Sequence, residues 1–156
     1  MSKSLGPTVP QAFLPQARDY LRRNGKTFHW ASFFLPKEQA HFATLLYAGC
    51  RQLDDIADNH STNKQDVRRE LYTIQREIQH PGTECAHPVA ALFVYLVRSR
   101  SMDSAAIVAF IDGLIMDTYA VALTSQAELD RYCYRVAGTV GTVSYTHLTL
   151  PTKRIV

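Results

Sequence analysis

PKEQAHFATLLYAGCRQLDDIAD (residues 36–58) is the stretch that decides the fold, because it keeps one helical period and then gathers charge at its end. Pro36 suits the first position of a helix, where a backbone N–H is not needed. Apolar or small residues recur every three or four positions and predict one core-facing side. These are Phe42, Leu46, Gly49, Leu53 and Ala57. We expect one long buried helix that stops at the polar residues 59–63.

The end of this helix carries Arg51, Asp54, Asp55 and Asp58, whose spacings of three, four and seven place them on one stripe. An ordinary wet helix face is the simplest interpretation. Two observations argue against it. The preceding turns of the stripe, which include Tyr47, lack charge, and acids at i,i+4 repel each other by a few tenths of a kcal/mol. We therefore expect these acids to line the mouth of a cavity.

Asp54 and Asp58 are one turn apart and suit Mg²⁺, with Mn²⁺ as the alternative ion. Mg²⁺ prefers oxygen ligands, keeps several waters and is often completed by substrate phosphates. Exposed pairs of aspartates are also common on helices that bind nothing, so a purely polar surface stays the alternative.

The rest of the chain also shows helical periodicity, and strand-like alternation is missing, so the sequence predicts an all-α fold. The other expected helices are 11–23, ended by Asn24-Gly25; one that starts with a capping box of Thr62 and Gln65 and ends at His80-Pro81-Gly82; one from Pro88; one from Asp103 or Ser104; and 126–141, behind a capping box of Ser125 and Glu128.

Composition limits the function. The 156 residues are 46% hydrophobic and 20% charged, as expected for one globular domain. A net charge of +3 with mixed signs argues against nucleic acid as a partner. Three separated cysteines without a C-x-x-C pair predict buried free thiols in a reducing cytoplasm. Residues 1–11 lack an apolar h-region, and the longest apolar run, residues 89–97, is too short to span a bilayer, so we expect a protein that is soluble or lies on a membrane surface.

The C-terminal segment SYTHLTLPTKRIV (residues 144–156) breaks the helical pattern and resembles translated adapter or vector sequence. We expect residues 1–143 to be the N-terminal part of a single domain and residues 144–156 to be a non-native tail. A genuine short tail is the alternative.

Four blocks resemble the phytoene/squalene synthase family: FHWASFFLP (28–36), LLYAGCRQLDDIAD (45–58), GLIMDTY (113–119) and YCYRVAGTVG (132–141). The resemblance implies an isoprenoid-synthase-type helical bundle around a central cavity. It also implies a prenyltransferase that joins two isoprenyl diphosphates head to head through a cyclopropyl diphosphate. Geranylgeranyl substrates would give phytoene, and farnesyl substrates would give squalene or dehydrosqualene, in carotenoid or triterpenoid biosynthesis. NADPH would be needed only for squalene.

The resemblance also implies roles for particular residues. Asp54 and Asp58 would bind Mg²⁺ and, with Tyr132, serve catalysis. The expected substrate-binding residues are Lys26, Arg51, Asp117, Val136, Val140 and Gly141. A carbocation formed from an allylic diphosphate needs a dry pocket with aromatic or aliphatic walls. Asp117 is expected to be buried with a partner or to line the cavity.

The sequence also departs from the family, because no second D-x-x-x-D follows Gly141. We therefore expect the parent protein to be an enzyme and this chain to be a truncated, inactive part of it. Two other functions stay open. One is a non-catalytic helical scaffold or binding module; the other is a di-metal carboxylate bundle built on E-x-x-H, at Glu38–His41, Glu77–His80 and Glu84–His87. Very apolar products would be consistent with peripheral association at a membrane, and the oligomeric state is not indicated.

Overall fold

The computed structural model describes residues 13–26, 29, 33–82, 85–100, 102–119, 125–138 and 141, and these residues contain helices and no strand. The all-α prediction is confirmed. The elements, in chain order, are α1 (Phe13–Asn24), α3 (Lys37–Ala57), α4 (Lys64–Gln79), α5 (Pro88–Arg100), α6 (Ser104–Asp117), α7 (Gln126–Cys133) and the π-helical turn η1 (Tyr134–Gly138).

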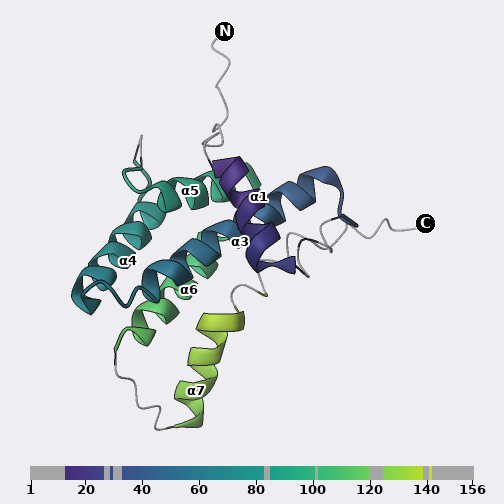
Figure 1. The fold of residues 1–156 in the computed structure, drawn as a ribbon. Helices are drawn as coiled ribbons and strands as arrows, with labels where there is room; N and C mark the ends of the chain where they lie inside the picture. Colours follow the sequence, from purple (N-terminus) through teal and green to yellow (C-terminus); the bar gives the residue numbers. More distant parts are fainter. Residues whose placement is uncertain are drawn as a thin grey trace.

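Helix α3 lies in the middle of the bundle and contacts α1, α4, α5 and α6, as Figure 1 shows. The five core positions expected from its sequence are all buried. Gly49 is needed at the contact with α5, because a Cβ built there would lie 2.8 Å from Cζ of Phe93. Phe93 is fully buried, so the missing side chain at Gly49 lets the two helices approach closely.

The helix ends follow the predicted capping residues with two corrections. Ser125 and Glu128 form the expected capping box, and the Asp103 side chain accepts from the Ala105 N–H at 2.9 Å. Pro36, however, is the residue before α3 and not its first residue. Helix α4 is capped by Asn63, one residue later than predicted, because the Asn63 side chain accepts from the Gln65 N–H at 2.9 Å.

The last predicted helix, 126–141, is not one continuous α-helix in the described residues. Helix α7 ends at Cys133 and widens into the π-helical turn η1. Within this turn a Cβ at position 138 would lie 3.1 Å from Cδ2 of Tyr134, so Gly138 leaves room for the tyrosine ring. The sequence pattern hid this change, because α and π turns use the same kinds of residue. The expected tail, 144–156, lies outside the described residues.

The cysteines are free, as expected, but only Cys50 is buried; Cys85 is partly exposed and Cys133 is exposed. Burial raises the pKa of the Cys50 thiol to about 12. Cys133 is exposed because no residue of α7 is buried. None of the helices that the structure describes is long and apolar enough to cross a membrane.

Candidate active site at the carboxyl end of helix α3

The carboxyl end of α3 concentrates negative charge where a helix tolerates it least. Asp54, Asp55 and Asp58 lie in the last turn or at the C-cap, and no basic residue belongs to that turn. The partial negative charge of the helix terminus disfavours carboxylates there. Lys64 gives partial relief, because its Nζ donates to the Ala57 carbonyl at 3.3 Å. The remaining excess of negative charge favours a bound cation.

The three acids of this end differ in their partners. Asp55 accepts from Arg51 at 2.9 Å and from the Tyr20 hydroxyl of α1 at 3.3 Å. Asp54 and Asp58, in contrast, form no ion pair with any residue that the structure describes. Asp55 therefore joins α1 to α3, and the pair with the i,i+4 spacing keeps its oxygens available.

Asp54 is the half-buried member of this pair. Burial is the main cause that raises the pKa of its carboxyl above the ordinary value of 3.8. Arg51 lowers this pKa, whereas the negative charges of Asp58, Asp55 and Asp117 raise it further. A carboxyl surrounded by other acids and partly removed from water is a favourable place for a divalent cation.

Helix α6 contributes Asp117 to the same end of the bundle, and Tyr132 approaches it from α7. A hydrogen bond to Asp117 is the first cause that raises the pKa of the Tyr132 hydroxyl, followed by burial. Asp117 has the expected partner, but it is exposed and not buried, because it is the last residue of α6. Asp117 of α6 thus interacts electrostatically with Asp54 of α3 and is hydrogen-bonded to Tyr132 of α7.

Arg51 combines an engaged and an unengaged donor. One terminal nitrogen holds Asp55, while Nε is buried without a hydrogen-bond partner among the described residues. A buried donor without an acceptor costs free energy, of the order of 1–3 kcal/mol. An anion that reaches this guanidinium would remove that cost, since arginine suits phosphate oxygens.

Other predicted site residues are not gathered here. Lys26 is exposed beyond the end of α1. The Val136 side chain and the whole of Val140 lie outside the described residues. Gly141 is exposed, and a Cβ added to it would meet nothing within 4 Å. The roles of these residues stay predictions.

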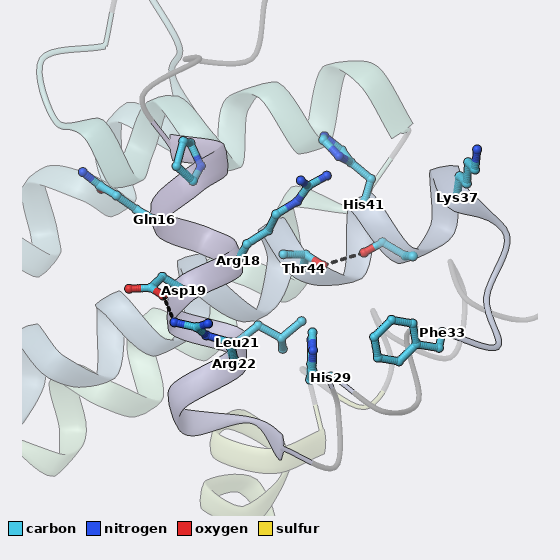
Figure 2. Close-up of a pocket in the computed structure, with 12 residues that line it drawn as sticks. Gln16, Arg18, Asp19, Leu21, Arg22, His29, Phe33, Lys37, His41 and Thr44 are labelled. Atoms are coloured by element: carbon cyan, nitrogen blue, oxygen red, sulfur yellow. Dashed lines mark hydrogen bonds and ion pairs between the residues drawn. The ribbon is translucent and has the colours of Figure 1, made fainter.

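Asp58 and Asp117 face solvent, and the cavity mouth expected beside the acids stays a prediction. A pocket of about 1060 Å³ lies at the other end of α3 (Figure 2). Its walls come from α1, from His29 and Phe33, and from the first turns of α3. No acid of the 54–58 cluster lines it.

The residues present fit Mg²⁺ only as an incomplete site. Among the described side chains, no group of three or more His, Cys, Asp and Glu residues could hold a metal ion by itself. Asp54 and Asp58 can supply two ligands with open positions beside them, which suits an ion that keeps waters and takes phosphate oxygens.

One histidine of the E-x-x-H pairs has a different role in the structure. The Nδ1 of His87 accepts a hydrogen bond from the Val89 N–H at 3.2 Å at the start of α5.

Two residues of this end were missed by the sequence reasoning. Tyr20 holds Asp55 from α1, 35 positions away, and Lys64 reaches back across the loop to the end of α3. The contact of Tyr20 depends on how α1 packs, which no local pattern encodes. The cluster of acids without lysine could have suggested a distant partner for one of them.

The chain belongs to the squalene/phytoene synthase family, whose model matches residues 21–154. The matched range extends into residues 144–154, and the non-native origin of residues 144–156 stays a prediction.

Individual relatives agree with this placement. The chain is 33% identical over 128 residues to the presqualene diphosphate synthase of Rhodopseudomonas palustris, covering 81% of this chain and 46% of that protein. It is 30% identical over 122 residues to the phytoene synthase of Thermus thermophilus, covering 78% and 41%.

The fold is similar to the crystal structure of a dehydrosqualene synthase in complex with ligand. The TM-score is 0.66 at 25% identity, and the match covers 86% of this chain and 46% of that one. The predicted bundle type is thereby confirmed. The chain spans about half the length of the relatives it matches.

Proposed function

We propose that the whole protein to which this chain belongs is a Mg²⁺-dependent prenyltransferase. It joins two isoprenyl diphosphates head to head, in a 1'-1 condensation through a cyclopropyl diphosphate. The observation that carries the proposal is that the three acids differ in their ion pairing. Asp55 forms an ion pair with Arg51 and accepts a hydrogen bond from Tyr20, while Asp54 and Asp58 form no ion pair with any described residue. Family membership supports the same reaction.

In this proposal the carboxyl end of α3 grips the diphosphate of one substrate. Asp54 and Asp58 hold the Mg²⁺, and Arg51 donates to a phosphate oxygen through the nitrogen that lacks a partner. When bound, Mg²⁺ neutralises the diphosphate and helps it to leave as an anion. The residues of the chain position this group and offset its charge.

Tyr132 and Asp117 act next to this proposed diphosphate-binding site. The Tyr132 hydroxyl donates to Asp117, and this hydrogen bond raises its pKa above the ordinary value of 10. A protonated phenol fixed by a carboxylate presents its ring in one orientation, and an aromatic face favours a nearby carbocation. We propose that Tyr132 contributes to the wall that stabilises the allylic cation, and that Lys26, Val136, Val140 and Gly141 complete the substrate site.

Two substrate lengths define the product. Geranylgeranyl diphosphate leads to phytoene, and farnesyl diphosphate leads to squalene or dehydrosqualene, with NADPH used only for squalene. The relatives named as presqualene diphosphate and phytoene synthases support either length. We place the protein in the cytoplasm or at the surface of a membrane. Incubation of the whole protein with each labelled substrate distinguishes the products.

The chain of 156 residues alone should not turn over, because it has one aspartate motif. The test measures product from the purified chain with Mg²⁺ and labelled farnesyl or geranylgeranyl diphosphate. No product is expected, and a steady rate of product formation would refute the claim of an incomplete site.

Binding to the whole protein tests the enzyme against a helical scaffold. Mg²⁺ with a non-reactive prenyl thiodiphosphate should raise the melting temperature, since a ligand that binds only the folded state stabilises it. Asp54→Asn should remove this rise, whereas the matched control Asp55→Asn, at an already paired position, should keep most of it. Absence of any rise in the parent would favour the scaffold.

A further inference from the structure

The opposite end of α3 carries an unusual surface, formed by a turn with two exposed aromatic residues. Phe33 and Phe34 are 69% and 87% exposed, the highest values among the large hydrophobic residues that the structure describes. They precede Pro36 in the turn that leads into α3. The Phe33 ring meets the His29 ring edge to face at 5.0 Å between centroids, which fixes its orientation.

Basic residues surround this aromatic turn. The pocket beside it is lined by Arg18, Arg22, Lys37, His29 and His41, with Asp19 as the only acid among its lining residues. Arg22 and Arg23 are paired with Asp19. Arg18 and Lys37 form no ion pair with any described residue. Figure 2 shows Phe33 and Lys37 at the end of the pocket where α3 begins.

The segment that includes this edge is basic. Residues 13–44 contain five Lys or Arg and two acids, a local net charge of +3. An anionic surface would therefore be attracted to this edge and not to the acidic end of α3. The pocket also has apolar walls, from Leu21, Phe33 and Ala40, next to its cations.

We propose that this edge, Phe33 and Phe34 with the cation-lined pocket beside them, docks the protein on an anionic lipid bilayer. Aromatic rings favour the headgroup level of a membrane, and lysine and arginine are attracted to anionic lipids there. The two rings insert at the interface while Arg18 and Lys37 contact lipid phosphates. Two exposed phenylalanines beside cations are costly in water and suit this environment.

The test is flotation of the purified chain with vesicles of phosphatidylcholine, alone or with about one third phosphatidylglycerol. Binding is expected to the anionic vesicles, to fall with salt, and to be weak on the neutral ones. The double variant Phe33→Ser/Phe34→Ser should bind about tenfold more weakly, because both interfacial rings are lost. The control Tyr72→Ser, an exposed aromatic residue on α4, should bind like the parent.

Charge is tested separately. Arg18→Gln/Lys37→Gln should weaken binding to anionic vesicles, whereas Arg69→Gln/Arg76→Gln, which removes equal charge from exposed positions on α4, should have a much smaller effect. Circular dichroism confirms that each variant folds.

Several results would overturn the proposal. The first is absence of binding to anionic vesicles. The second is binding of Phe33→Ser/Phe34→Ser that equals that of the parent. The third is a loss of binding in Arg69→Gln/Arg76→Gln as large as that in Arg18→Gln/Lys37→Gln. Stabilisation by inorganic phosphate without vesicle binding would assign the pocket to a soluble anion. Dimers that dissociate in Phe33→Ser/Phe34→Ser would assign the edge to a second copy. Asp54→Asn should keep vesicle binding, so this test and that of the condensation fail independently.

Discussion

The two ends of helix α3 carry opposite charge and opposite relations to their neighbours. The N-terminal end of α3 starts at Lys37 and lies beside cations from α1 and exposed aromatic rings. The C-terminal end holds three acids, of which only Asp55 forms an ion pair with a described residue. A single rigid helix thus separates a basic, apolar edge from an acidic, polar one. Under the two proposals, one helix serves two kinds of anion, held directly by cations at its N-terminal end and through a metal ion at its C-terminal end.

The strongest test of the acidic end is Asp54→Asn in the whole protein. It should lower the rate of condensation by about 100-fold or more, because an amide is a poor ligand for Mg²⁺ and the partly buried oxygen pair is lost. Steady-state kinetics with labelled substrate measures this. Asp55→Asn is the matched control and should lose far less activity; equal losses would mean that the pairing of Asp55 does not distinguish the two acids.

The packing of the middle of α3 against α5 can be tested at Gly49. This contact holds the helix that carries both ends. Gly49→Ala should destabilise the chain by about 1–3 kcal/mol, because the new Cβ would lie 2.8 Å from Cζ of the buried Phe93. Urea unfolding followed by circular dichroism gives the free energy of unfolding. Gly141→Ala adds a Cβ to open space within the described residues and should not destabilise. Unchanged stability of Gly49→Ala would show that α5 can move away freely.

The pH dependence of stability can isolate Asp54. Its pKa is raised above 3.8 in the folded chain, mainly by burial, so its contribution to stability is present below that value and is lost as pH rises through the folded pKa. Asp54→Asn should therefore be more stable than the parent at neutral pH without ligand. The difference should shrink as pH falls toward the unfolded pKa. Unfolding curves at several pH values measure it, and a variant that is less stable at neutral pH would contradict the burial argument.

The smallest effect is expected from Tyr20→Phe, which removes the 3.3 Å hydrogen bond to Asp55 across α1 and α3. The loss should be about 0.5 kcal/mol or less, since the bond is exposed and water can replace it. A double-mutant cycle with Asp55→Asn gives the coupling between the two residues. A coupling energy close to zero would mean that Tyr20 does not help to hold the Asp55 side chain away from Asp54 and Asp58.

Much of the fold was predictable because its signals are local. The 3.6-residue period identified the core face of α3, and the Ser125 and Glu128 pair identified the start of α7. The errors at Pro36 and Asn63 are single-residue shifts, since neighbouring residues compete for the same cap. The change from α7 to η1 was missed because hydrophobic period does not report the width of a turn.

The candidate site was predictable in its residues but not in its electrostatics. Spacing alone placed Arg51 and the three acids on one stripe, and the resemblance selected Asp54 and Asp58. Only the packed structure shows why Asp55 differs from them, since Tyr20 comes from a distant helix. The exposure of Asp117 and the position of the pocket at the other end of α3 also depend on packing between helices.

The π-helical turn η1 changes the direction in which the side chains after it point, relative to a continuous α-helix. A turn closed by i→i+5 hydrogen bonds holds one residue more than an α turn, so the direction of later side chains rotates by about 100°. Tyr132 lies before this turn, so its hydrogen bond to Asp117 does not depend on it. Insertion or deletion of a single residue between 134 and 138 would therefore re-aim everything after it without moving Tyr132.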